Sequence, residues 1–275
     1  MQKKQKQKQK NLINYRNLDF SKNSNTKTGN NLIIYGKHSV FSALKQKRRT
    51  IFQILVTKNT KSDLELFLQK QQIQVNQNLI KLVETNQIES LVGKDQLHQG
   101  IVIECSRLPI KNQFELLEEL HSLEKSQLPN LLLLDQLSDP QNIGAIIRSA
   151  VSFGITKIIF CEHNAPKESA TMARASVGTI EMADLIVVTN FSNLIEKLKK
   201  IGYWCVGLDG GSNHQISEIR NYDHIALIVG SEGSGIRDLV KKNCDILTKI
   251  IIDDKVESLN ASVATSIALY ELSKK

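Results

Sequence analysis

Three short segments combine glycine with polar side chains where an apolar run gives way to a helical pattern. They read "DPQNIGAIIRSA" at 139–150, "GSEGSG" at 230–235 and "VESLNASVA" at 256–264. Glycine lets the backbone approach a ligand closely, and the start of a helix presents free N–H groups. The amide, carboxylate and guanidinium groups in these segments can hold and orient a substrate. The three segments are therefore candidate parts of one site.

The segment at 230–235 follows the apolar run "HIALIV" and precedes a helical pattern. Because no Lys-Ser or Lys-Thr pair follows its glycines, it is not a phosphate-binding P-loop. It also lies late in the chain, whereas a dinucleotide-binding fingerprint normally follows the first strand of its domain. Alone, it predicts only a strand-to-helix turn that a ligand can approach.

The segment at 256–264 carries polar residues at the predicted start of the last helix. Ser258 has the side chain of a helix N-cap. Leu259, Val263 and Ile267 recur every four residues and predict the buried stripe of that helix. Asn260, expected in the first turn, is harder to explain as a structural residue.

The segment at 139–150 places Asn142 before Gly144 and Arg148 four residues after it, about one helical turn deeper. Arg148 falls inside the apolar stripe predicted for this helix. A buried guanidinium is costly without an anionic partner. Arg148 is therefore either a surface arginine paired with a carboxylate or a residue whose anionic partner is the substrate.

The elements that must position these residues alternate regularly from residue 130 onward. Near-continuous apolar strands, beginning with "LLLLDQL" and ending with "DILTKIIID", alternate with helical patterns. This alternation predicts an α/β domain at 130–275 with a mainly parallel sheet covered on both faces. Ligands of such sheets bind outside the carboxyl ends of the strands, where the three segments fall.

A smaller α/β unit is predicted at 31–107, followed by a linker at 108–129 that contains a helix. Its expected elements include a helix that buries Val40, Ala43 and Leu44, a strand at "QIQVN" and a helical stretch with Ile80 and Val83. A length of 275 residues fits two such domains.

Composition narrows the class of protein. The chain is 41% hydrophobic, without an apolar run long enough to cross a bilayer, and it holds four cysteines without a CxxC pair. We therefore expect no membrane span, no metal site, and reduced, mostly buried thiols in a cytoplasmic protein. Residues 1–30 hold eight Lys and Arg and one Asp, a charge of +7, which leaves +1 of the total +8 for the rest. This polar, low-complexity segment is predicted to be a disordered basic arm.

Taken in order, the three segments resemble motifs of the SpoU/TrmH branch of the SPOUT methyltransferases. The matching stretches are "LDQLSDPQNIGAIIRSAVSFG" (134–154), "IVGSEGSGI" (228–236) and "KIIIDDKVESLNASVATSIALYE" (249–271). The smaller unit, with "YGKHSVFSAL" and "HQGIVIE", resembles the ribosomal-protein-like substrate-binding domain of this family. The greatest resemblance is to the bacterial guanosine-2′-O-methyltransferases of large-subunit rRNA.

The resemblance implies methyl transfer from S-adenosylmethionine to a ribose 2′-hydroxyl in RNA, with a guanosine of 23S rRNA as the expected target. It also implies a homodimer and a C-terminal sheet that threads a deep trefoil knot. The implied cofactor-binding residues are Gly230, Ile250 and Leu259. The residues at the family's catalytic or active-site positions are Asn142, Arg148, Glu232, Ser258 and Asn260.

The chain departs from the family in the third motif, which in many members reads Ile-Pro-Met followed by a small residue and Gly. Here "IIIDDK" puts Ile251 at the proline position and Asp253 and Asp254 at the small ones. These carboxylates would attract a sulfonium cation or repel RNA phosphate.

Arg148 is the family's candidate base, yet a guanidinium stays protonated and offers no acceptor. We interpret it as a bidentate clamp on the phosphate of the target nucleotide, with proton removal by phosphate oxygen or water. Three alternatives stay open: a tRNA 2′-O-methyltransferase, a non-catalytic RNA-binding protein on the same scaffold and, least favoured, a nucleotide-binding oxidoreductase.

Overall fold

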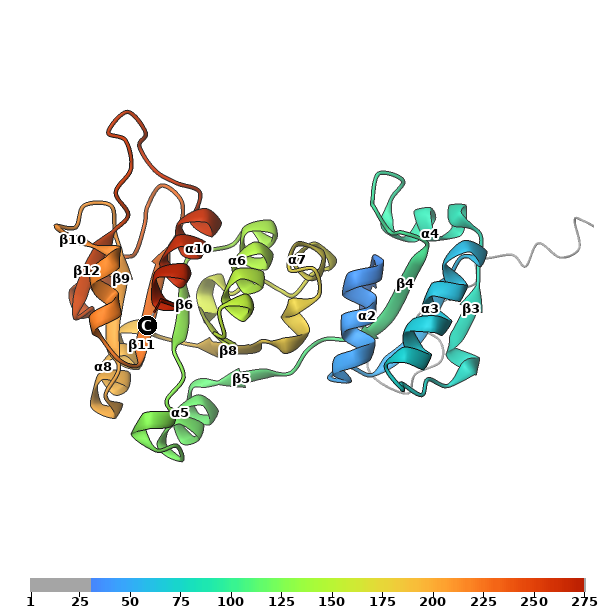
Figure 1. Cartoon of the computed structure of the whole chain (residues 1–275), viewed down its shortest axis with the longest axis horizontal. Helices are drawn as coiled ribbons and strands as arrows, with labels where there is room; N and C mark the ends of the chain where they lie inside the picture. The colour runs from blue at the N-terminus through green and yellow to red at the C-terminus, as the bar shows by residue number, and fades with distance from the viewer. Residues whose placement is uncertain (1–30, 275) are drawn as a thin grey trace, which may run out of the picture. The chain divides into compact units, whose positions relative to one another are not determined.

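The computed structural model describes residues 31–274, in which helices and strands alternate around two sheets (Figure 1). The basic arm predicted at 1–30 lies outside the described residues. Within the described part, no helix is both long and apolar enough to cross a membrane.

The first sheet has four strands in the order β1-β4-β2-β3, with β2 antiparallel to β4 and parallel to β3. Its strands are β1 (Asn31–Tyr35), β2 (Ile51–Val56), β3 (Ile80–Leu82) and β4 (Ile101–Ser106). The helices beside them are α2 (Lys37–Gln46), α3 (Lys58–Lys70) and α4 (Thr85–Val92). As predicted, α2 buries Val40, Ala43 and Leu44.

Two predictions in this unit are wrong. The "QIQVN" segment forms no strand, because the chain leaves α3 through Gln72 in a left-handed conformation and Ile73 and Val75 pack against the core without strand pairing. The stretch with Ile80 and Val83 is not helical. Its residues 80–82 form β3, which pairs with β2.

The second sheet has eight strands in the order β10-β12-β9-β11-β6-β7-β8-β5, and every neighbouring pair is parallel. Its strands are β5 (Ile110–Asn112), β6 (Leu131–Asp135), β7 (Lys157–Cys161), β8 (Asp184–Val188), β9 (Trp204–Leu208), β10 (His214–Gln215), β11 (Ile225–Gly230) and β12 (Ile246–Lys249). The mainly parallel sheet predicted from the sequence is confirmed. The segment expected as a linker contributes β5 to this sheet and contains α5 (Gln113–His121).

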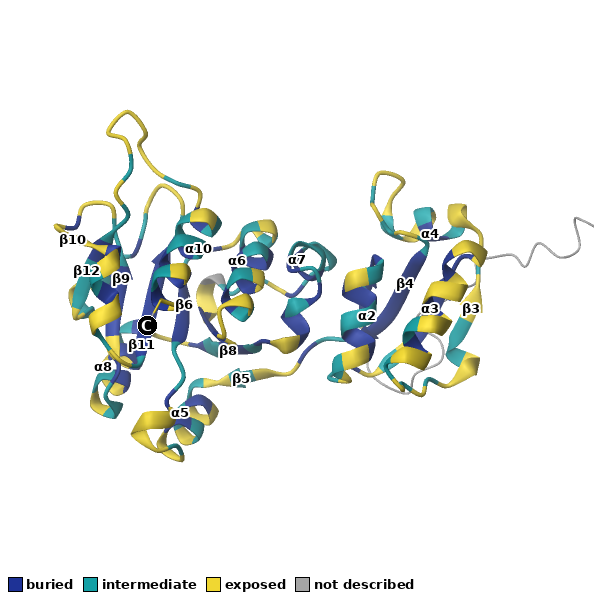
Figure 2. Cartoon of the chain, viewed as in Figure 1, coloured by how far each residue is buried: buried dark blue, intermediate teal, exposed yellow. Residues whose placement is uncertain are grey.

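Helices cover both faces of this sheet, as Figure 2 shows by their buried inner sides. They are α5, α6 (Pro140–Ser152), α7 (Ala170–Ala175), α8 (Phe191–Ile201), α9 (Asp238–Asn243) and α10 (Ala261–Leu272). The run "LLLL" in β6 shows why the strands of this second sheet are apolar throughout. Leu131 and Leu133 join the core that includes α5 and α8, whereas Leu132 and Leu134 join the core that includes α6 and α10. Successive side chains of a strand point to opposite faces, so both sets must be apolar.

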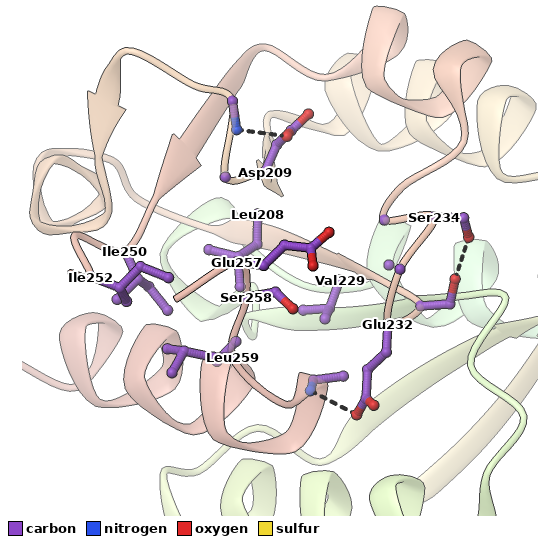
Figure 3. A pocket seen from close by; sticks show the side chains of 18 of the residues that line it. Leu208, Asp209, Val229, Glu232, Ser234, Ile250, Ile252, Glu257, Ser258 and Leu259 are labelled. Carbon is purple, nitrogen blue, oxygen red and sulfur yellow. Dashed lines mark hydrogen bonds between the residues drawn. The ribbon is translucent and has the colours of Figure 1, made fainter. Parts of the chain in front are cut away.

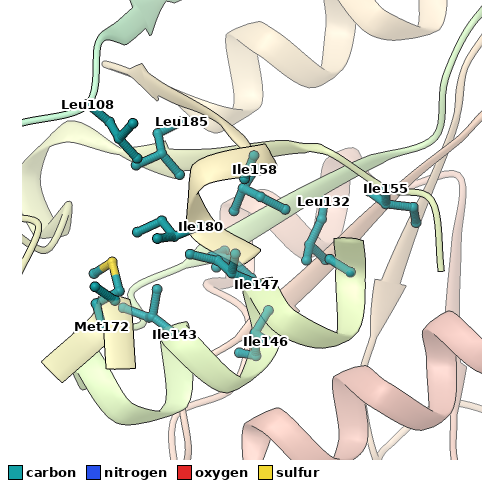
Figure 4. Packing of buried hydrophobic residues seen from close by; sticks show 14 of the residues in the cluster. Leu108, Leu132, Ile143, Ile146, Ile147, Ile155, Ile158, Met172, Ile180 and Leu185 are labelled. Atoms are coloured by element: carbon teal, nitrogen blue, oxygen red, sulfur yellow. The ribbon is translucent and has the colours of Figure 1, made fainter. Parts of the chain in front are cut away.

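Helix α6 begins at a well-formed cap, because the Asp139 carboxylate accepts hydrogen bonds from the backbone N–H groups of Gln141 and Asn142. Its buried residues are Ile143, Gly144, Ile146, Ile147 and Ala150, and Figure 4 shows the three isoleucines packed in the core.

The placement of Arg148 within the apolar stripe was wrong. The buried residues of α6 follow the spacing of three and four, and Arg148 lies off that stripe with its side chain exposed.

Helix α10 also corrects the sequence analysis. Its N-cap is Asn260, not Ser258, and its Oδ1 accepts hydrogen bonds from the backbone N–H groups of Ser262 and Val263. The predicted stripe is wrong as well, since Val263 is 47% exposed. Packing against the rest of the fold selects another face of this helix than the one predicted. That face consists of Ala261, Thr265, Ala268, Leu269 and Leu272.

Candidate active site

A pocket of about 410 Å³ opens at the carboxyl ends of the central strands of the second sheet. Leu208 lines it at the end of β9, Val229 and Gly230 at the end of β11, and Ile250 just after β12 (Figure 3). Its volume is typical of sites for small molecules. The pocket lies where the sequence analysis expected ligands to bind.

All three predicted cofactor-binding residues, Gly230, Ile250 and Leu259, line this pocket. At Gly230 the loop turns back on itself, and Ser231 and Gly235 exchange two backbone hydrogen bonds of 3.2 and 2.9 Å. A Cβ atom on Gly230 would lie 2.0 Å from the carbonyl carbon of Gly235. Only glycine fits there, because the two backbone segments are in direct contact.

Three of the predicted active-site residues meet at the edge of the pocket. Asn142 Nδ2 donates to Glu232 Oε1 at 2.9 Å, and Asn260 Nδ2 donates to the same oxygen at 2.5 Å and to Asn142 Oδ1 at 3.0 Å. The backbone N–H of Ala261 donates to Glu232 Oε1 at 3.1 Å, the bond drawn at Glu232 in Figure 3. These contacts form a closed triangle, here called the amide–carboxylate cluster (Asn142, Glu232 and Asn260).

The cluster ties together three segments that are distant in sequence. Asn142 lies in the first turn of α6, Glu232 in the loop after β11, and Asn260 at the start of α10. Asn260 uses its oxygen to cap α10 and its nitrogen to join the cluster, so a structural and a site role coincide in one side chain. Glu232 is exposed, which leaves its negative charge accessible to a bound molecule.

Ser258 and Arg148 have different surroundings. Ser258 is exposed and lines the pocket beside Leu259. Arg148 is also exposed but is not part of the pocket lining, and within residues 31–274 no hydrogen bond or ion pair engages its guanidinium. A charged group of this kind remains available for an anion from outside the chain.

An ion pair between a buried carboxylate and a partly exposed arginine fixes the end of the loop that carries Glu232. Asp135, at the end of β6, is fully buried and accepts from the backbone N–H and the Nε of Arg237 at 2.9 Å each. The Arg237 Nη2 lies 2.7 Å from the same carboxylate. The hydrogen bond to Asp135 raises the pKa of Arg237. The ion pair links the first motif to the residues that follow the second.

The sequence analysis missed three charged residues of the pocket lining, Asp209, Lys241 and Glu257. Lys241 Nζ lies 2.6 Å from Asp209 Oδ2, and the Gly211 backbone N–H donates to Asp209 Oδ1 at 3.0 Å. Burial alone would raise the pKa of Asp209, but these contacts outweigh it and the pKa is lowered. The sequence did offer a signal for Asp209. The "LDGG" at the end of β9 is a glycine-bearing strand end like the one at Gly230.

Among residues 31–274, no group of three or more His, Cys, Asp or Glu side chains is arranged to hold a metal ion. The four cysteines are free, and Cys105, Cys161 and Cys205 are buried, as predicted. Burial raises the pKa of the Cys205 thiol to about 12.

Residues 129–270 match the SpoU rRNA Methylase family, and residues 33–110 match the family of RNA 2′-O ribose methyltransferase substrate-binding domains. The chain therefore belongs to the SpoU family of RNA 2′-O-ribose methyltransferases.

Proteins similar to this chain in sequence or in fold are also named as methyltransferases. A 23S rRNA (guanosine-2′-O-)-methyltransferase RlmB of Coxiella burnetii is 35% identical over 88% of this chain and 95% of its own length. A putative TrmH family tRNA/rRNA methyltransferase YacO of Bacillus subtilis is 33% identical over 88% of this chain and 95% of its own. The crystal structure of the SpoU methyltransferase AviRb from Streptomyces viridochromogenes in complex with AdoMet has a TM-score of 0.70 at 19% identity, covering 89% of this chain and 90% of that one. That structural likeness supports the fold.

Proposed function

We propose that this protein methylates the 2′-hydroxyl of a guanosine ribose in large-subunit rRNA, with S-adenosylmethionine as the methyl donor. The observation that carries the proposal is the amide–carboxylate cluster at the edge of a pocket lined by Gly230, Ile250 and Leu259. The 35% identical relative described as a 23S rRNA (guanosine-2′-O-)-methyltransferase supports the choice of substrate.

The residues of the pocket fit this donor. Leu208, Val229, Ile250, Ile252 and Leu259 offer an apolar surface for an adenine ring, and Gly210 and Gly211 expose backbone to polar groups. When bound, S-adenosylmethionine supplies an electrophilic methyl on a sulfonium, which becomes a neutral thioether once the methyl has passed to oxygen.

The chain's own residues must place the ribose oxygen in line with that methyl and help it lose its proton. We assign the amide–carboxylate cluster to orientation of the nucleotide, because one oxygen of Glu232 is held by three donors and its orientation is thereby fixed. Arg148 acts as a clamp on the phosphate of the target nucleotide and stabilises charge that develops on the 2′-oxygen. The proton passes to phosphate oxygen or water, since a guanidinium has no acceptor. We assign Ser258 to the active site because it lies on the pocket wall next to this cluster.

We further propose a homodimer in which Arg148 of one subunit completes the site of the other. Arg148 does not join the amide–carboxylate cluster of its own chain. The same region of α6 and α10 carries exposed Phe153, Val263 and Tyr270, a surface suited to a second subunit. Mixing an Arg148→Ala chain with a Gly230→Ala chain tests this. Random subunit exchange should restore activity to about a quarter of wild type, because half the dimers then hold one intact site. No recovery after confirmed exchange would contradict the shared site.

The remaining assignments are also proposals. Residues 31–107 form the RNA-binding domain, and 108–129 lead from it into the methyltransferase domain at 130–275, to whose sheet they contribute β5. The basic arm at 1–30 stays a prediction. The trefoil knot stays a prediction. Because the proposed substrate is ribosomal RNA, we place the reaction in the cytoplasm.

Incubation of the full chain with methyl-labelled S-adenosylmethionine and total RNA tests the reaction. The label should appear in large-subunit rRNA and survive removal of the bases. Label on a base atom would exclude ribose methylation, and label confined to tRNA would favour the tRNA-modifying alternative. A chain that binds RNA without transferring label would be the non-catalytic alternative.

A further inference from the structure

The acidic side chains on the pocket wall are not equivalent. Asp209 is paired with Lys241 at 2.6 Å, and Glu232 is held in the amide–carboxylate cluster. Glu257 differs from both, because no hydrogen bond or ion pair engages its carboxylate within residues 31–274. Glu257 is thus the acidic residue of this wall whose carboxylate makes neither a hydrogen bond nor an ion pair with another described residue.

The position of Glu257 makes that free charge relevant to the ligand. Figure 3 shows its side chain extending into the pocket near Leu208, Val229 and Ser258. Glu257 is exposed. A ligand that covers this wall lowers the local dielectric constant and so strengthens the attraction between the carboxylate and a cation.

The chemistry of methyl transfer defines which part of the ligand carries a distinguishing charge. S-adenosylmethionine has a positive sulfonium, and its product S-adenosylhomocysteine has a neutral thioether at the same atom. Adenosine, the α-amino group and the α-carboxylate are common to both. A carboxylate near the sulfur therefore distinguishes donor from product, whereas one that binds a shared group does not.

The proposed reaction sets where the sulfur of the donor must lie relative to Glu257. The transferred methyl must point toward the nucleotide held at the amide–carboxylate cluster, so the sulfur lies on the cluster side of the pocket. Glu257 is three residues before Asn260 in the segment that leads from the pocket into that cluster.

We propose that Glu257 is a specificity-determining residue that favours the sulfonium donor over the neutral product. This inference rests on the proposed function. Loss of the positive charge on methyl transfer weakens the interaction with Glu257 and so aids release of the product. Asp253 and Asp254, the acidic residues singled out in the sequence, do not line the pocket and do not perform this role.

Calorimetric titration of the full chain with S-adenosylmethionine and with S-adenosylhomocysteine tests the proposal without measuring catalysis. Glu257→Gln keeps the size of the side chain and removes its charge. We expect it to weaken donor binding about tenfold and to leave product binding within about twofold. Asp254→Asn is the matched control, because it removes the same charge from the same exposed loop outside the pocket. It should leave both affinities within about twofold.

The outcomes separate this inference from the proposed function. Equal weakening of donor and product in Glu257→Gln would overturn the inference, because Glu257 would then bind a shared group. Unchanged affinities for both would overturn it as well. In either case, wild-type binding of the donor would leave the proposed function intact. Failure of the wild-type chain to bind the donor would contradict both.

Discussion

The side-chain nitrogen of Asn142 lies 2.9 Å from Oε1 of Glu232, although the two residues are 90 positions apart. This contact joins the first turn of α6 to the loop that lines the pocket after β11. In the proposed reaction, the orientation of a bound nucleotide therefore depends on the second motif as much as on the first.

Replacement of Glu232 by alanine should lower the rate of methylation roughly tenfold to a hundredfold, because Asn142 and Asn260 lose their common acceptor. Glu232→Gln keeps an acceptor oxygen and should retain more activity. The free energy of unfolding should fall by only about 1 kcal/mol, since the site is exposed. Single-turnover methylation and urea unfolding measure the two effects. Lys242→Ala, an exposed change on α9 outside the pocket lining, is the control. Near-normal methylation by Glu232→Ala would remove the cluster from the mechanism.

Arg148→Ala should fold normally and bind S-adenosylmethionine with near wild-type affinity, because Arg148 is exposed and outside the pocket lining. Loss of a clamp used mainly in the transition state costs about 3 kcal/mol, or roughly a hundredfold in rate. Arg148→Lys should recover only part of this, since an ammonium cannot bind phosphate in a bidentate manner. Lys197→Ala, an exposed change on α8, is the control. Methylation by Arg148→Ala within a few-fold of wild type would make Arg148 an ordinary surface residue.

The sequence predicted the second sheet well because its strands are continuous apolar runs and its turns carry glycine. Glycine also marked the site segments in the sequence. At Gly230 a glycine is required because two backbone segments touch there. Local patterns were less reliable at helix starts. The helix that follows Asn260 begins there because Asn260 caps it, and a Ser two residues earlier offered an equally good cap by residue type.

The exposure of Arg148 follows from helical spacing, whereas the surroundings of Glu257 are set by tertiary structure and were not predictable from local spacing. Arg148 is close in sequence to buried isoleucines, yet a shift of 100° per residue along a helix turns it to the surface. Glu257 reads as a solvated residue in a polar loop, and only the placement of that loop against β9 and β11 brings it to the pocket.

Arg237→Ala should destabilise the fold by about 3 kcal/mol, because it leaves the fully buried Asp135 carboxylate without its ionic partner. Arg220→Ala removes an exposed ion pair with Glu271 and should cost less than about 1 kcal/mol. Denaturant unfolding of both variants makes the comparison. Equal losses of stability would mean that the Asp135–Arg237 pair does not brace the loop as inferred.

Asp184 provides a test by pH. Burial raises the pKa of its carboxyl, but the hydrogen bond from Lys111 and the charges of Lys111, Lys157 and Arg48 outweigh this and lower it. Since the folded pKa lies below the unfolded value of about 3.9, the ionised group stabilises the fold above that pH and ceases to do so as the pH falls through the folded pKa. Asp184→Asn should therefore be about 1 kcal/mol less stable than wild type near pH 7, and the difference should shrink as the pH falls through the folded pKa. Urea unfolding across this range checks the trend, and a difference that does not shrink in acid would contradict it.

Mapping of 2′-O-methylated nucleotides in total RNA, from cells with and without this protein, tests the central claim most directly. We predict that one guanosine ribose of large-subunit rRNA loses its methyl group when the protein is absent and regains it with the wild-type chain but not with Arg148→Ala. Loss of methylation only in tRNA, or an unchanged pattern in all RNA, would contradict the account.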